Sequence, residues 1–173
     1  MSLKSFSLIG PGRYRAIIAL ASLVSGAVAL YLHLWKIGQT SAPLACGLDG
    51  GCVRAQMSYY GWFWGIDVAL IGAVGYAAIL IVAAIGLLPA LRDNPWVSWL
   101  LMALIWPAVL FTIRLKYGEF VVLRTFCPWC FVNVVTISLN AWLSAKDWVR
   151  VFPGDDEYEP DDLVLLGLRA PAE

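Results

Sequence analysis

Charged residues are scarce in this sequence. They make up 14% of the 173 residues, whereas hydrophobic residues make up 61%. A soluble domain of this length needs more polar surface, and long uncharged runs are typical of segments that cross a lipid bilayer. The chain also lacks a stripe of lysine and arginine residues, which argues against nucleic-acid binding. We therefore expect an integral membrane protein with no nucleic-acid partner.

Histidine, cysteine and sequence repeats are rare or missing as well. The chain has one histidine, four cysteines and no internal repeat. His33 falls near the end of the first apolar run, where a residue of the membrane interface is a better interpretation than a catalyst. Seven of the twelve acidic residues follow Pro153. We expect residues 1–150 to form one membrane domain and residues 151–173 to form an acidic cytoplasmic tail.

Four apolar runs are long enough to cross a membrane. They cover about residues 16–35, 65–88, 96–115 and 125–145. The first run could instead be the core of a cleaved signal peptide, but further spans follow it, so an uncleaved first helix is favoured. The expected fold class is all-α: a bundle of four transmembrane helices.

The connection between the first two spans is too polar to cross. It contains Cys46, a glycine-rich turn and Cys52, followed by an amphipathic stretch at residues 53–60. We expect this stretch to form a short half-helix that caps the bundle at the membrane surface, with Val53 and Met57 on its apolar face.

Four spans place both termini on the same side of the membrane. The basic residues before the first span favour the cytoplasmic side for them. All four cysteines then lie on the outer side, at or just within the membrane surface. In a bacterium this is the periplasmic face of the inner membrane, where disulfides form and persist.

The stretch from Thr125 to Cys130 places two thiols three residues apart where the fourth helix should begin. Thr125 can serve as the N-cap, and Pro128 is tolerated in the first turn. The N-terminus of a helix favours a thiolate, which is the attacking species in disulfide exchange. This pattern predicts a redox-active dithiol at Cys127 and Cys130.

The four cysteines form two pairs, Cys46/Cys52 and Cys127/Cys130, and three other interpretations remain open. They are two structural disulfides, a zinc site, and inert buried thiols. A C-x-x-C disulfide closes a very small ring and gains little loop entropy. The first pair has five intervening residues where zinc knuckles favour two to four. A redox role is therefore favoured, without a metal.

The order of these features resembles the vitamin K epoxide reductase family. The resemblance rests on Cys46 and Cys52 in the first loop, Ser58 six residues later, and Cys127 and Cys130 at the fourth span. Residues 65–76 are also similar to that family's second span. The resemblance implies a quinone, ubiquinone or menaquinone, held near Cys130. It further implies that Cys127 exchanges disulfides with Cys52, and that Cys46/Cys52 exchange with a thioredoxin-like partner.

Two positions depart from the animal members of this family. Val134 stands where they have a tyrosine, and Val68 stands where they have an asparagine. Both side chains donate to quinone oxygens in that family, so the sequence supports plain quinone reduction and does not support epoxide reduction. Since only a short acidic tail follows Arg150, we expect the partner to be a separate periplasmic thioredoxin-fold protein.

Three further residues are candidates for the quinone site. Asn133 lies one turn below Cys130 and could donate to a quinone oxygen, or it could form a hydrogen bond between helices. Asp67 could deliver protons if burial raises its pKa, or it could lie at headgroup depth beside Arg54 or Arg124. Ser58 could contact the quinone from the half-helix, or it could satisfy the backbone.

The favoured function is a membrane thiol-disulfide oxidoreductase. It would oxidise a thioredoxin-like protein, pass the electrons through two cysteine pairs to a quinone, and so support disulfide formation. Two alternatives remain: a reductase of a quinone or quinone epoxide for its own sake, and a non-catalytic membrane protein with structural disulfides.

Overall fold

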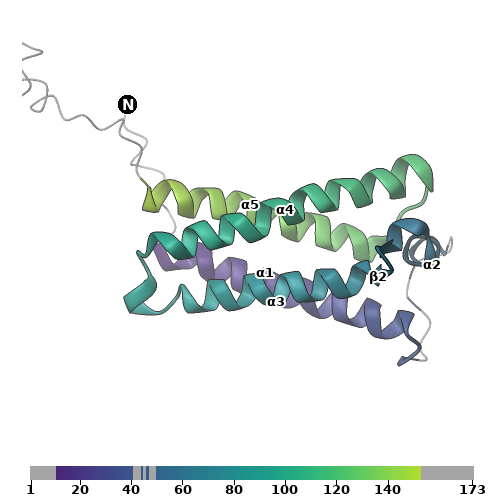
Figure 1. Ribbon diagram of the computed structural model, residues 1–173, viewed down its shortest axis with the longest axis horizontal. Coiled ribbons are helices and arrows are strands. Elements are labelled where there is room, and N and C mark those ends of the chain that lie inside the picture. Colours follow the sequence, from purple (N-terminus) through teal and green to yellow (C-terminus); the bar gives the residue numbers. More distant parts are fainter. Residues whose placement is uncertain (1–10, 41–43, 45, 47–49, 153–173) are drawn as a thin grey trace, which may run out of the picture.

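The computed structural model describes residues 11–40, 44, 46 and 50–152. Four long helices make up most of this part: α1 (Pro11–Lys36), α3 (Val68–Ile85), α4 (Pro95–Tyr117) and α5 (Pro128–Val151). Each contacts two neighbours, in the order α1, α3, α4, α5 and back to α1, so the helices form a closed bundle (Figure 1). The expected all-α four-helix fold is confirmed. We expect the acidic tail at residues 151–173; Val151 is the last residue of α5, and residues 153–173 lie outside the described residues.

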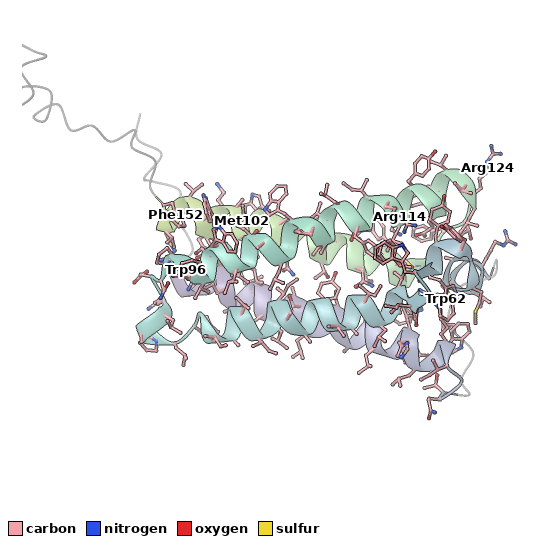
Figure 2. All side chains as sticks on the ribbon, in the orientation of Figure 1. Trp62, Trp96, Met102, Arg114, Arg124 and Phe152 are labelled. Atoms are coloured by element: carbon pink, nitrogen blue, oxygen red, sulfur yellow. A yellow bond between two sulfur atoms is a disulfide. The ribbon has the colours of Figure 1, made fainter. Side chains whose placement is uncertain are left out.

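Three of the helices are long and apolar enough to cross a membrane: α1, α3, and α4 with the turn that follows it. Large apolar side chains such as Leu20 and Leu110 are exposed on the outside of the bundle, and Figure 2 shows side chains covering that outer surface along its length. Exposed apolar surface of this extent needs lipid around it. With 24 residues, α5 is also long enough to cross, at about 1.5 Å per residue.

Four polar residues of α5 are buried in the bundle, which explains how a less apolar helix fits among the other three: Thr136, Asn140, Ser144 and Asp147. Asn140 is fully buried, and its Nδ2 donates to Ser22 Oγ of α1 at 3.0 Å. Ser25 Oγ of α1 donates to Thr136 Oγ1 at 2.7 Å. These hydrogen bonds hold α1 and α5 together where a hydrophobic driving force is missing.

A buried ion pair joins all four helices at the end of the bundle where α1 begins. Arg15 and Asp147 are both 0% exposed, and Arg15 Nε lies 3.0 Å from Asp147 Oδ2. Arg15 also donates to Ser98 Oγ of α4 and to the carbonyls of Gly86 and Leu91, which flank the turn after α3. Leu91 ends the short 3-10 helix η3 (Pro89–Leu91) in this turn. All three guanidinium nitrogens of Arg15 thus donate to acceptors, which offsets the cost of burying its charge.

The other end of the bundle is capped by the connection between α1 and α3 (Figure 1). The cap consists of helix α2 (Gly51–Met57), the 3-10 helix η2 (Tyr59–Gly61) and a hairpin of β1 (Trp62–Phe63) and β2 (Ile66–Asp67). The expected half-helix is therefore present. Its buried face carries Cys52 and Gln56, while Val53 and Met57 lie together on an exposed apolar face.

The hairpin moves the start of the second long helix from residue 65 to Val68. Trp62 pairs with Asp67 and Phe63 with Ile66. The two linking residues, Trp64 and Gly65, have φ angles of 51° and 79°. Two positive φ angles are what a two-residue turn of type I′ needs, and the glycine meets this need at little steric cost. Residues 65–67 therefore belong to the cap.

Residues 116–124, between the third and fourth apolar runs, are mostly helical. Helix α4 continues to Tyr117 and then widens into the π-helix η4 (Gly118–Val122). A π-turn inserts an extra residue into the helical path and often marks a functional position. Here it turns Glu119 into the bundle, where its side chain is buried.

Candidate active site

All four cysteines lie at the capped end of the bundle, in one buried cluster with Leu32, Leu44 and Ala69. Cys46 and Cys52 form a disulfide with a Cα–Cα distance of 5.4 Å. Cys127 and Cys130 are free thiols. The two pairs are therefore in opposite redox states and side by side, which is the arrangement that disulfide exchange requires.

Cys127, and not Thr125, is the N-cap of α5. It has an extended backbone, with φ −115° and ψ 108°, and its Sγ accepts from the N–H of Cys130 at 3.3 Å. The reason is Pro128, because a residue that precedes proline is forced out of the helical region. The expected cap was wrong by two residues. The reactive sulfur therefore interacts directly with the N-terminus of the helix.

This position changes the acidity of the Cys127 thiol. The pKa of Cys127 is lowered from its usual value, first because the side chain of Cys130 hydrogen-bonds to its sulfur, and also because the N–H of Cys130 does. Burial and the negative charge of Glu119 act in the opposite direction, and the charge of Lys116 acts in the same direction. A lowered pKa makes more thiolate available for attack on a disulfide.

A close backbone approach holds Cys52 next to this helix start. A Cβ atom added at Gly51 would lie 2.7 Å from Thr125 Oγ1 and closer still to the carbonyl oxygen of Phe126. Only glycine leaves room for such an approach. Cys52 directly follows Gly51 in α2 and Cys127 directly follows Phe126, and both cysteines are 0% exposed. The contact at Gly51 therefore sets the approach of one cysteine pair to the other.

A cavity of about 620 Å³ lies within the bundle below the cap, lined by residues of all four long helices. Cys130 lines this cavity, and Cys127 does not. The lining is largely apolar, and α3 is bare on this side because Gly72 and Gly75 stand one turn apart. A Cβ atom at Gly75 would meet nothing within 4 Å. The cavity offers space for a flat apolar ring next to one of the two free thiols.

Two amides provide polar groups beside Cys130. Gln56 of α2 lines the cavity, and its Nε2 donates to Cys130 Sγ at 3.6 Å. Asn133 lines the cavity as well. Its Nδ2 donates to the carbonyl of Trp129 at 3.3 Å, while its buried Oδ1 has no hydrogen-bond partner among the described residues. An unpaired buried amide oxygen is costly, so Asn133 Oδ1 is available to accept a hydrogen bond from a ligand.

Asp67 lies elsewhere and has other partners than expected. It caps α3 and does not line the cavity. Its carboxylate pairs with Lys36 Nζ at 2.6 Å and His33 Nδ1 at 2.7 Å, not with Arg54 or Arg124.

The ionisation of Asp67 also differs from our expectation. Burial acts to raise its pKa, but the hydrogen bonds from Lys36, His33 and the N–H of Ala69 outweigh burial and hold the pKa below its usual value. A carboxyl whose pKa is lowered is a poor proton donor. The hypothesis of a raised pKa was therefore wrong.

Ser58 also lies outside the cavity lining. It follows the last residue of α2, and its Oγ donates to the carbonyl of Ala55 at 2.8 Å. The backbone interpretation describes this residue, and the expected quinone contact has no geometric support.

Our reading of the sequence missed Lys116 and Glu119, the charged residues that line the cavity among those described. Glu119 Oε1 accepts from the N–H of Cys127 at 2.6 Å, and its Oε2 pairs with Lys116 Nζ. The sequence signal was weak, because it consists of two opposite charges three residues apart at the end of an apolar run.

In a comparison with protein families, residues 16–145 match the Vitamin K epoxide reductase family. Proteins of this family are membrane redox enzymes that act through cysteines, generally use quinones and are generally paired with thioredoxin-like proteins. The match includes all four cysteines and nearly the whole bundle that holds the cavity. We conclude that this chain, a multi-pass membrane oxidoreductase, belongs to the vitamin K epoxide reductase family.

Proposed function

We propose that this protein oxidises a reduced thioredoxin-fold protein and passes the electrons through its two cysteine pairs to a membrane quinone. The observation that carries the proposal is the position of Cys130. It is the free thiol that lines the apolar cavity, while its neighbour Cys127 is buried next to the segment that carries Cys52. Cys130 thus faces the cavity in which an apolar electron acceptor can bind, and Cys127 faces the second cysteine pair.

The four thiols would divide the work by position. Cys46 and Cys52 accept electrons from the partner, as their disulfide is reduced through a mixed disulfide with Cys46, the more accessible of the two. Cys52, now a thiolate or thiol, exchanges with the Cys127–Cys130 disulfide at Cys127. Cys130 then delivers the electron pair into the cavity. The present combination of an outer disulfide and an inner dithiol corresponds to the step before electrons leave for the quinone.

The cavity suits a quinone by its chemistry. A quinone supplies an electron sink that takes up two electrons and two protons. Its ring needs flat apolar walls, which α3 offers at Gly72 and Gly75, and its oxygens need hydrogen bonds. Asn133 can donate one of these through the second N–H of its Nδ2, in the place of the tyrosine and asparagine that Val134 and Val68 replace, and its unpaired Oδ1 can accept from a hydroquinone hydroxyl. We further propose that the capped end lies on the extracytoplasmic side, where partner disulfides persist.

A reconstituted assay tests this proposal. The purified protein in lipid vesicles is mixed with a reduced thioredoxin-fold protein that carries a C-x-x-C pair, and with a short-chain ubiquinone or menaquinone in parallel. We expect one hydroquinone to form for each partner disulfide. Cys130→Ser should abolish hydroquinone formation while the outer pair still exchanges with the partner, and Cys46→Ser should abolish exchange with the partner.

Two other results would contradict this proposal and favour a different function. If dithiothreitol supports quinone reduction and no thioredoxin-fold protein does, the protein is a quinone reductase for its own sake. If all cysteines resist alkylation after mild reductant and no quinone is reduced, the disulfides are structural and the protein is not an enzyme.

A further inference from the structure

We propose that Lys116 and Glu119 form a proton path that carries the proton of the Cys127 thiol to a quinone bound in the cavity. This inference rests on the proposed function and extends it, because quinone reduction needs protons as well as electrons. It assigns to a buried ion pair the transfer of the Cys127 proton, because Cys127 does not line the cavity itself.

The position of the pair connects the two reactants. Glu119 is 5% exposed, and its Oε1 accepts from the N–H of Cys127 at 2.6 Å. Its other oxygen pairs with Lys116, whose side chain is also largely buried. Lys116, Glu119 and Cys130 all line the same cavity. The pair therefore contacts Cys127 on one side and lines the cavity proposed for the quinone on the other.

The charges are expensive at this place. Burial of two ions costs several kcal/mol each before their attraction is counted, and charged residues at membrane depth are usually functional. A neutral glutamine could accept the same hydrogen bond from Cys127 without this cost. The fold does not need these two charges, but proton transfer does, because the carboxylate can bind a proton and the ammonium can give one.

The reaction balances without another reagent. Formation of the Cys127–Cys130 disulfide makes one Sγ–Sγ bond and releases two electrons and two thiol protons. A quinone takes up both electrons and both protons and leaves as hydroquinone. Glu119 accepts the proton of Cys127, Lys116 gives a proton to the nearby quinone oxygen, and transfer from Glu119 to Lys116 restores the ion pair. The proton of Cys130 reaches the second oxygen directly, since Cys130 lines the cavity.

A positioning role is the competing explanation, because Glu119 also holds the backbone before α5. Its carbonyl accepts from the N–H of Thr125 at 3.1 Å, and its side chain fixes Cys127. Glu119→Gln separates the two roles. The amide oxygen of glutamine still accepts from the N–H of Cys127, but it cannot take up the proton.

Two measurements on Glu119→Gln test the inference. The first is the rate of hydroquinone formation from the reduced protein in one turnover, which should fall about a hundredfold, the usual scale of lost general acid–base catalysis. The second uses quinone-free protein and follows exchange between the cysteine pairs by alkylation and mass spectrometry. That rate should stay within about twofold of wild type. Asp67→Asn is the matched control, because it removes another buried carboxylate at the same end outside the cavity, and its hydroquinone rate should stay near wild type.

The outcomes are separable. A Glu119→Gln protein with a normal hydroquinone rate overturns the inference, and so does a variant in which both rates fall together, because that result shows a positioning role. Lys116→Gln is the second variant if Glu119→Gln does not fold, with the same expectation for both rates. If the wild-type protein itself forms no hydroquinone, the proposed function has failed and the inference fails with it.

Discussion

Substitution of Gly51 by alanine should uncouple the two cysteine pairs while it leaves each pair intact. The added Cβ would lie 2.7 Å from Thr125 Oγ1 and 3.3 Å from the carbonyl carbon of Phe126, with the carbonyl oxygen closer still. Since ordinary van der Waals contact of a Cβ begins at about 3.4 Å, α2 must move away by roughly 1 Å. A displacement of this size in reacting groups can cost about a hundredfold in rate, or about 2.7 kcal/mol of activation free energy.

The assay starts from protein with all four thiols reduced. Excess quinone is added, the reaction is stopped by alkylation at intervals, and the free thiols of each pair are counted by mass spectrometry. In Gly51→Ala we expect Cys127 and Cys130 to be oxidised at the wild-type rate. Oxidation of Cys46 and Cys52 should lag about a hundredfold, because it depends on exchange between the pairs.

Helix propensity cannot explain such a loss, because alanine is about 1 kcal/mol better than glycine within a helix. Val53→Ala, a change on the exposed face of the same helix, is the control and should leave both rates near wild type. If the outer pair of Gly51→Ala is oxidised as fast as that of the wild type, the close approach at Gly51 does not set the exchange geometry, and our reasoning about this contact is wrong.

Three other changes have defined outcomes. Although burial acts in the opposite direction, the ion pair with Lys36 keeps the pKa of Asp67 low in the folded protein. Asp67→Asn should therefore lower the melting temperature at neutral pH. This difference from wild type should disappear as the pH falls below about 3.9 and through the folded pKa of Asp67. An unchanged difference in acid would contradict this. Asn133→Ala should raise the KM for quinone about tenfold, for about 1–1.5 kcal/mol of one hydrogen bond, whereas a normal KM with lower thermal stability would identify a packing residue. Asp147→Ala leaves Arg15 buried without its ion partner and should cost about 3–5 kcal/mol in thermal unfolding; an unchanged melting temperature would show that the pair contributes little.

The parts of the site that could be predicted from the sequence are local. The spacing of Cys127 and Cys130 at a helix start, with Pro128 between them, depends only on neighbouring residues, and the structure has this arrangement. The paired loop cysteines and the long apolar runs are local signals too. Even here the N-cap is Cys127 and not Thr125, because Pro128 excludes the preceding residue from the helical region.

The parts that could not be predicted depend on distant contacts. Asp67 is locked by Lys36 and His33, which precede it by 31 and 34 residues, and nothing near Asp67 in the sequence indicates this pairing. Glu119 was missed because a π-turn, not a loop, directs it inward. Gln56 hydrogen-bonds to Cys130, which is 74 residues away in the sequence. It points into the bundle because it lies on the same buried face of α2 as Cys52.

The central claim is that electrons pass between the pairs through Cys52 and Cys127. The most direct test removes Cys46, so that Cys52 has no partner in its own pair. Cys46→Ser is oxidised with quinone, alkylated without reductant and digested, and the disulfide-linked peptides are identified by mass spectrometry. We predict a stable disulfide between Cys52 and Cys127, which reductant cleaves, with Cys130 alkylated. A disulfide between Cys52 and Cys130, or a Cys127–Cys130 disulfide alone with Cys52 always free, would contradict the account.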